Sequence, residues 1–145
     1  MAFRKSGKSG AGKDLAKVDF FEGFSPAELD RVAALSDEVS AEKGALLMDQ
    51  GKVGRECFVI LEGKAGVYIG DHYVATLEAG STVGEMAIID QRPRSASVKA
   101  LTDMKLLSFD TEHFRTLLEV MPKASQRVLA DMNAKLRHQN LSDND

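Results

Sequence analysis

The sequence predicts an α+β fold in which an antiparallel, jelly-roll-like β-roll follows one helix and precedes two more. Two observations support this order. Apolar residues recur at helical spacing towards both ends of the chain, and short apolar runs broken by glycine fill its middle. The 145 residues allow one domain of ordinary size. Because 43% of them are hydrophobic, the chain can bury a core and is not disordered throughout.

The first helix is predicted to begin at Ser25. A serine is a good N-cap, Pro26 suits the first helical position, and Glu28 completes a capping box with Ser25. The apolar residues that then recur at helical spacing are Leu29, Val32, Ala33 and Leu35.

Short strands are predicted between about Val39 and Phe109. The apolar runs there cover residues 57–61, 67–69, 72–77, 98–101 and 105–109. Strands at such close spacing indicate a small antiparallel barrel or sandwich. Gly70 and Asp71 lie between two of these runs and are predicted to form a two-residue hairpin turn. Cys57 lies inside an apolar run and is predicted to be buried.

Two helices are predicted after Phe109. The first is capped by Asp110 or Thr111, and its apolar stripe is formed by Phe114, Leu117, Leu118 and Met121. Pro122 interrupts the pattern, because proline fits only the start of a helix. The second helix then carries the stripe Leu129, Met132 and Leu136.

Three segments are predicted along the chain: a flexible basic tail over residues 1–18, a folded domain over 19–141 and a flexible C-terminus over 142–145. Residues 1–17 carry a net charge of +4, and the remaining residues sum to −7 within a total of −3. An acidic body is unfavourable for binding nucleic acid. The basic tail is able to contact nucleic acid, a membrane or an acidic partner, and the alternative is a solvated tail without a partner.

Several classes of protein are disfavoured by what the sequence lacks. No uncharged apolar run reaches the roughly 18 residues of a membrane span, and no apolar segment typical of a secretory signal follows the start. The single cysteine, Cys57, excludes an internal disulfide and a cysteine-based zinc site. The three histidines lack the spacing of metal ligands. We therefore expect a cytoplasmic protein without a metal or a cofactor.

The segment 83–97 carries the candidate binding site. Gly84 permits a sharp exit from a strand and the close approach of a ligand. Residues 85–89 can form one helical turn, whose free amides would bind an anion. Arg94 follows Gly84 by ten residues and is suited to bidentate capture of a phosphate, while the small residues Ser95 and Ala96 leave room for it.

This segment resembles the phosphate-binding cassette of cyclic nucleotide-binding domains, a family that includes the bacterial cyclic AMP receptor protein, kinase regulatory subunits and cyclic nucleotide-gated channels. The matching residues are Gly84-Glu85-Met86-Ala87 and, after a short spacer, Pro93-Arg94-Ser95-Ala96-Ser97. The resemblance spans about residues 19–141, because the helix, the glycine-punctuated roll and the closing helices follow the order of the family.

The resemblance implies a role for each matching residue. Glu85 accepts a hydrogen bond from the ribose 2′-hydroxyl, Arg94 pairs with an exocyclic phosphate oxygen, and Ser95 assists. The backbone amides that hold the cyclic phosphate are those of Gly84, Glu85, Met86, Ala87 and Ala96. The alternative for Glu85 and Arg94 is a structural salt bridge in a fold that binds nothing.

The resemblance also implies how the base is held. The strand residues that flank the base are Val67, Val74 and Ala75. The last helix closes over the base and moves on binding, which would place the amides of Gln139 and Asn140 against adenine. The alternative is that this helix end is frayed and contributes little.

The predicted function is a stand-alone regulatory module that binds a cyclic nucleotide and signals to an effector protein of unknown identity. The ligand is cyclic AMP, favoured by Ser95, with cyclic GMP as the alternative. We expect no enzymatic activity, because no nucleophile–base pair or metal cluster accompanies the motif. The competing functions are a transcription factor, an enzyme and a scaffold that binds no nucleotide. The receptor proteins continue into a DNA-binding domain, whereas this chain ends at Asp145, so no DNA-binding domain and a monomer or weak dimer are expected.

Overall fold

The computed structural model describes residues 3–8, 21–52, 55–84, 93–123 and 126. Within these residues the strands form two antiparallel sheets. Sheet A has the order β1 (Phe3–Lys8), β2 (Asp37–Ala41), β9 (Met104–Asp110), β4 (Glu56–Glu62) and β7 (Thr82–Val83). Sheet B has the order β3 (Leu46–Met48), β8 (Ser97–Ala100), β5 (Ala65–Ile69) and β6 (His72–Leu77).

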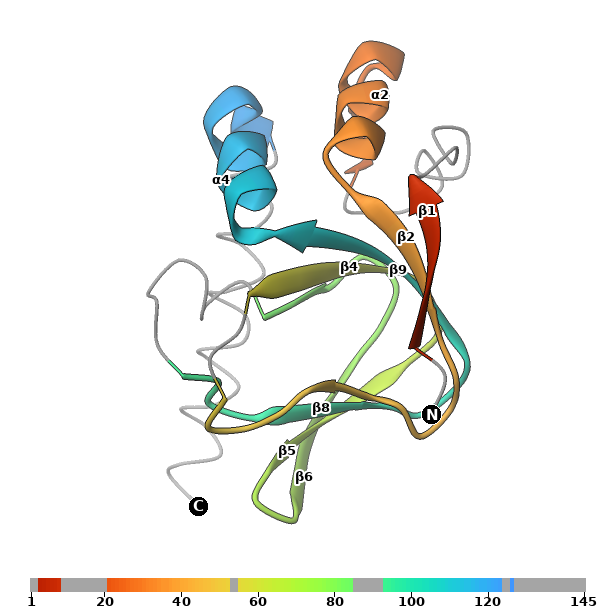
Figure 1. Ribbon diagram of the computed structural model, residues 1–145, viewed down its shortest axis with the longest axis vertical. Coiled ribbons are helices and arrows are strands. Elements are labelled where there is room, and N and C mark those ends of the chain that lie inside the picture. Colours follow the sequence, from red (N-terminus) through yellow and green to blue (C-terminus); the bar gives the residue numbers. More distant parts are fainter. Residues whose placement is uncertain (1–2, 9–20, 53–54, 85–92, 124–125, 127–145) are drawn as a thin grey trace.

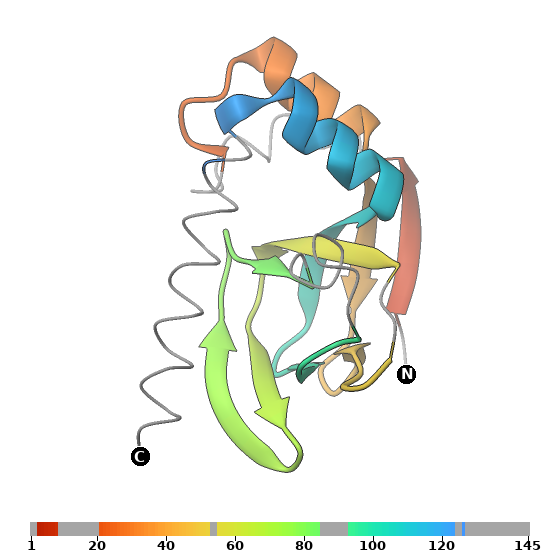
Figure 2. The same cartoon turned by 90° about the vertical axis from the view of Figure 1, so that its left-hand side faces the viewer.

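The two described helices cover one side of this roll. Helices α2 (Pro26–Ala34) and α4 (Thr111–Val120) lie side by side above sheet A, and sheet B lies on the opposite side of sheet A (Figures 1 and 2). The structure thus confirms the predicted α+β fold with an antiparallel β-roll. Of the second C-terminal helix, the described Pro122, Lys123 and Gln126 are helical, and the stripe from Leu129 onwards lies outside the described residues.

Strand β4 of sheet A is buried on both faces, and this explains why its sequence is an unbroken apolar run. Phe58 and Ile60 point into the roll, whereas Cys57 and Val59 point towards the helices, as alternation along a strand requires. Cys57 is fully buried, as predicted.

The apolar core accordingly has two parts. The roll-interior cluster contains Val39, Ala41, Ala45, Leu47, Phe58, Ile60, Ala65, Val83, Val98, Ala100, Met104 and Leu106. The helical-layer cluster contains Phe21, Phe24, Leu29, Val32, Ala33, Cys57, Val59, Leu107, Phe109, Phe114, Leu117 and Met121.

The helix starts agree with the sequence prediction. Ser25 Oγ accepts from the Glu28 amide at 3.1 Å, and the Glu28 carboxylate accepts from the Ser25 amide at 2.8 Å, which completes the capping box. Asp110, and not Thr111, caps α4 by accepting from the His113 amide at 2.8 Å. Helix α2 ends one residue before Leu35, which forms its C-cap.

The strand predictions hold for the longer runs and fail for the shortest strands. Strand β6 has the predicted bounds, and Gly70 and Asp71 form the turn between β5 and β6. The prediction missed β2, whose five residues include only two apolar ones, and it missed β3 and β7, which have only three and two residues. Strands this short carry too few residues for an apolar alternation to stand out.

The N-terminal segment differs from the expected flexible tail at residues 3–8. These residues form β1, which pairs with β2 so that Phe3 faces Ala41, Arg4 faces Ser40 and Lys5 faces Val39. Without β1, the outer edge of β2 would present unpaired backbone groups, and an added strand satisfies them. A backbone pairing of this kind depends on the free edge of a distant strand, so the composition of the tail did not reveal it.

Within the part of the chain that the structure describes, no helix combines the length and the apolar character needed to cross a bilayer.

Candidate functional site

The two halves of the motif meet at Arg94. Gly84 follows β7 directly with a φ of +86°, a left-handed backbone conformation that glycine adopts without strain. Its carbonyl accepts a hydrogen bond from Arg94 Nη1 at 2.7 Å. Arg94 Nη2 donates to the carbonyl of Glu56, at the start of β4, at 2.5 Å. The ten-residue spacing in the sequence therefore becomes a direct contact in the fold.

Burial makes the placement of this arginine specific. Arg94 is only 7% exposed, and a buried cation is tolerated only where acceptors replace the water that it loses. A guanidinium has five N–H donors, and those at Nη1 and Nη2 donate to the carbonyls of Gly84 and Glu56. The site is therefore a fixed, partly desolvated cation with the donor geometry that a phosphate prefers.

Gly84 is required here by space as well as by φ. A Cβ atom at this position would overlap the Arg94 guanidinium, closer than carbon contacts are found in proteins. Gly84 thus allows the main chain to approach the Arg94 side chain directly. The sequence predicts such a close approach for a ligand.

The other predicted site residues that are described lie in two places. Ser95 is exposed and Ala96 is buried, directly after Arg94 and before β8. In sheet B, Val67 of β5 pairs with Ala75 of β6, so these two residues share one face. Val74 lies at the irregularity between this pair and the next one along the ladder.

The remaining predicted site residues lie outside the described part of the chain. They are Glu85, Met86, Ala87, Gln139 and Asn140. The predicted helical turn over residues 85–89 also lies outside it.

Glu56 was missed by the sequence analysis. It contributes to the site through its main-chain carbonyl, which carries no residue-specific signal in a sequence. Its carboxylate also accepts a hydrogen bond of 2.5 Å from Ser108 on β9, which ties the start of β4 to the strand that leads into α4. The Glu56 carboxylate and the Ser108 hydroxyl are brought together only by the pairing of β4 with β9.

A cavity of about 280 Å³ is lined in part by Glu56 and is not the candidate phosphate site. Its described lining residues are Leu35, Asp37, Arg55, Glu56, Ser108, Asp110 and His113. Three carboxylates against one arginine would repel an anion, and neither Gly84 nor Arg94 lines the cavity. Among the described residues, no group of three histidine, cysteine or acidic side chains is arranged to hold a metal ion.

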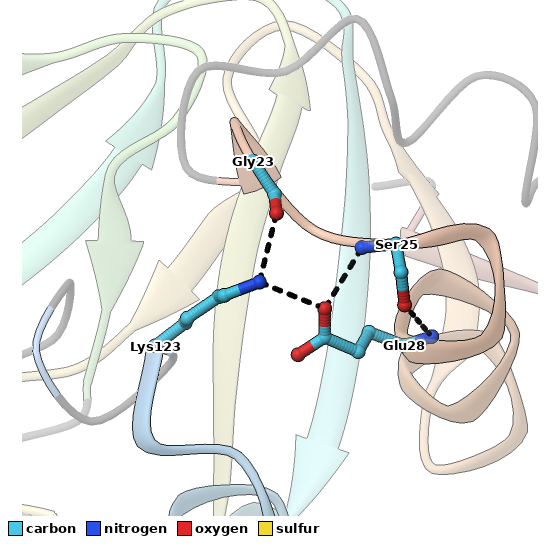
Figure 3. A network of polar contacts seen from close by, with 4 residues as sticks. All are labelled: Gly23, Ser25, Glu28 and Lys123. Atoms are coloured by element: carbon cyan, nitrogen blue, oxygen red, sulfur yellow. Dashed lines mark hydrogen bonds and ion pairs between the residues drawn. The ribbon is translucent and has the colours of Figure 1, made fainter.

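A second cation, Lys123, links the segment that follows α4 to the start of α2 (Figure 3). Its Nζ donates to the Gly23 carbonyl at 2.9 Å and to Glu28 Oε1 at 3.0 Å, and it lies 5.9 Å from the centroid of the Phe24 ring. The Ser25 amide and, after it, the Lys123 ammonium hold the pKa of Glu28 below its usual value of 4.5. The residues that follow α4 are therefore attached to the start of α2.

Comparison with known proteins gives one family match, to the cyclic nucleotide-binding domain, over residues 38–120. The chain is 34% identical over 114 residues to a cyclic nucleotide-gated potassium channel from Rhizobium etli, covering 79% of this chain and 32% of the channel. It is 29% identical over 104 residues to human cGMP-dependent protein kinase 2, covering 72% of this chain and 14% of the kinase. The chain thus spans less than a third of the length of either relative.

Among solved structures, a cyclic nucleotide-binding domain from Methylobacillus flagellatus KT superposes with a TM-score of 0.72 and 26% identity. That superposition covers 97% of this chain and 84% of the other. The similarity therefore extends over the roll and the helical layer together.

Proposed function

Because this chain belongs to the family of cyclic nucleotide-binding domains, we propose that it binds a 3′,5′-cyclic nucleotide and acts as a regulatory module. Cyclic AMP is the proposed ligand, and cyclic GMP is the alternative. The observation that carries the proposal is the contact between Gly84 and the buried guanidinium of Arg94. This contact fixes a cation beside a main-chain turn, the combination that a cyclic phosphate requires.

The proposed contacts follow the motif. Arg94 pairs with an exocyclic phosphate oxygen, Ser95 assists, and the amides of residues 84–87 and of Ala96 bind the remaining oxygens. Glu85 accepts from the ribose 2′-hydroxyl. Val67, Val74 and Ala75 flank the base, and the pairing of Val67 with Ala75 supports this role for those two residues.

The proposal also includes a preference for cyclic AMP over cyclic GMP. Ser95 after the arginine favours cyclic AMP, as in the receptor proteins of the family. The human relative, by contrast, is named a cGMP-dependent kinase. Both ligands therefore belong in the first experiment.

Calorimetric titration of the full chain with each nucleotide tests the proposal, with Arg94→Ala as the diagnostic variant. Removing one partner of a buried charge pair costs about 3–5 kcal/mol, so affinity should fall by roughly 150- to 5,000-fold. Arg115, which is exposed on α4, gives a matched control, and Arg115→Ala should bind like the unmodified chain. Absence of saturable binding of either nucleotide at millimolar concentration would contradict the proposal.

One further variant and one ligand analogue test the ribose contact separately from the phosphate contact. Glu85→Gln should weaken binding less than Arg94→Ala, because an amide oxygen still accepts a hydrogen bond. The 2′-deoxy analogue should bind poorly to the unmodified chain. Equal affinity for the ribose and deoxyribose forms would remove Glu85 from the site.

We also propose that the C-terminal segment closes over the base, with Gln139 and Asn140 facing it. The packing of α4 on sheet A through Phe114 and Leu117 and the attachment of Lys123 to α2 support a coupled movement of the helical layer. Amide hydrogen exchange across residues 111–141 should therefore slow on binding. Truncation after Leu136 should cost base selectivity and leave phosphate capture intact. Unchanged exchange at saturation would mean that the site is static.

In this proposal the module is cytoplasmic, is a monomer or weak dimer, and passes the change to an effector protein. Its nucleotide-binding domain covers residues 19–141, and β1 adds an edge strand to sheet A. The relatives named as a potassium channel and as a protein kinase are far longer than this chain. Sedimentation of the full chain with and without nucleotide tests the oligomeric state.

A further inference from the structure

The turn over residues 49–52, which contacts the main chain of Arg94, has a defined geometry. Lys52 N donates to the Asp49 carbonyl at 3.2 Å, so residues 49–52 form a β-turn. Gly51 occupies its third position with a φ of +84°, the positive value that a type II turn requires there. A Cβ atom at Gly51 would meet no other atom within 4 Å, so the constraint on this residue is conformational and not steric.

This turn holds the main chain of Arg94 on both sides. Gly51 N donates to the Arg94 carbonyl at 2.8 Å, and Arg94 N donates to the Lys52 carbonyl at 2.8 Å. The turn also reaches the end of the motif, because Gln50 N donates to Ser97 Oγ at 3.0 Å. Two residues of the turn therefore fix the backbone from which the guanidinium projects, and a third fixes the motif three residues further on.

We propose that the turn over residues 49–52 positions Arg94 for phosphate capture, with Gly51 as the positioning residue. The inference rests on the proposed binding of a cyclic nucleotide at Arg94. A guanidinium aimed by two carbonyls can present a fixed fork only if its own main chain is also fixed. The long arginine side chain would otherwise lose rotamer entropy when the phosphate binds, and affinity would fall.

The chain offers a closely matched control turn at Gly44. Ala45 N donates to the Glu42 carbonyl at 2.9 Å, Gly44 occupies the third position with a φ of +92°, and its amide donates to the Ala100 carbonyl at 2.8 Å. A Cβ atom there also meets nothing within 4 Å. The two turns share geometry and hydrogen bonding, but only the turn at Gly51 contacts Arg94.

The experiment compares Gly51→Pro with Gly44→Pro in the full chain. Each substitution removes one N–H donor and forbids the positive φ, so both should lower the melting temperature by a similar amount. Gly51→Pro alone should lower cyclic nucleotide affinity, by about tenfold for the backbone contacts it breaks. Equal affinities for the two variants would overturn the proposal.

A milder pair of variants covers the case in which Gly51→Pro does not fold. Gly51→Ala is strained at a φ of +84°, whereas Gly51→Asn is tolerated better because asparagine adopts positive φ more readily. Affinity should therefore decrease for Gly51→Ala and recover for Gly51→Asn. A loss of equal size in both variants would count against a conformational role.

A spectroscopic measurement separates this inference from the proposed function. The Nε–H resonance of Arg94 in the nitrogen-15 spectrum reports its placement without any ligand. Gly51→Pro, and not Gly44→Pro, should shift or broaden this resonance. If the unmodified chain binds no nucleotide but this shift occurs, the proposed function fails and the positioning role stands. If the chain binds and neither variant disturbs the resonance, the positioning role fails alone.

Discussion

The cations Arg94 and Lys123 mark two regions of this domain that are held together by different means. Arg94 lies in a region that we call the roll end, where Gly84, the start of β4 and the turn over residues 49–52 meet. It is almost fully buried and donates to the main-chain carbonyls of Gly84 and Glu56. Lys123 lies in the helical layer, half-exposed, and contacts one carbonyl, one carboxylate and one aromatic ring. Backbone acceptors do not titrate, whereas a partly exposed ion pair responds to pH and salt.

The two regions therefore differ in how firmly their residues are held in place. Residues at the roll end are fixed by ladders and main-chain contacts, which suits a site that must present a constant geometry to a ligand. The helical layer rests on sheet A through side-chain packing, and Lys123 adds an adjustable contact. Helices attached in this way can shift without breaking the hydrogen bonds of a sheet.

The largest expected effect tests the packing of the helical layer. Phe114 is fully buried, and its ring contacts that of Phe109 edge-on at a centroid distance of 5.9 Å. Phe114→Ala should lower the free energy of unfolding by about 3–5 kcal/mol, measured by urea denaturation. Where the variant is still folded, its nucleotide affinity should fall much less than that of Arg94→Ala. A hundredfold loss of affinity would show that the two regions are not separable.

The next effect tests the roll end. Gly84→Ala introduces a side chain at a φ of +86° and places it against the Arg94 guanidinium. Loss of a charged hydrogen bond of about 1.5–3 kcal/mol corresponds to an affinity decrease of roughly 10- to 150-fold, measured by calorimetry. Gly44→Ala carries the same conformational strain without the overlap and should leave affinity unchanged. If both variants bind normally, Gly84 does not shape the site.

A smaller effect is expected at the start of α2. Ser25→Ala removes the side-chain acceptor of the Glu28 amide, which should cost about 1 kcal/mol in thermal or urea denaturation. Ser25→Asp should restore most of this stability, because aspartate is an equally good N-cap. The binding of nucleotide should stay the same in both variants, and a change would link the cap to the site.

The smallest effect is the pH dependence of the contact between Glu28 and Lys123. The pKa of Glu28 is lowered on folding, so its carboxylate stabilises the fold above the unfolded value of 4.5. This contribution is lost as the pH falls through the lower folded pKa. Lys123→Met should raise the pKa of Glu28, measured by carboxyl NMR, but leave it below 4.5 because the Ser25 amide remains.

Lys99 provides the control for this last prediction. Its ammonium lies 5.9 Å from the centroid of the Tyr68 ring, the same distance as Lys123 from Phe24. Lys99→Met therefore removes a comparable cation–π contact without touching Glu28. The melting temperature of Lys99→Met should follow the same dependence on acid pH and on salt as the unmodified chain. If Lys99→Met and Lys123→Met both weakened the dependence of the melting temperature on acid pH, the effect would come from cation–π contacts and not from Glu28.

Local features of this protein could be predicted from the sequence because their causes lie within a few residues. The capping box needs only Ser25 and Glu28, three residues apart, and the hairpin turn needs only Gly70 and Asp71. The apolar run of β4 marks a strand buried on both faces. The motif at Gly84 and Arg94 was also visible, because its residue types and spacing are contained in one short segment.

The tertiary structure decided everything that depends on main-chain atoms from distant segments. Three such contacts use main-chain groups that nearly every residue carries. They are the pairing of β1 with β2, the hydrogen bond from Arg94 to the Glu56 carbonyl, and the hydrogen bonds between Arg94 and the turn at Gly51. Glu28 and Lys123 are 95 residues apart, and only the packing of α2 beside the end of α4 brings them together. A sequence specifies such contacts only through the whole fold, because backbone N–H and C=O groups have no residue-specific signature.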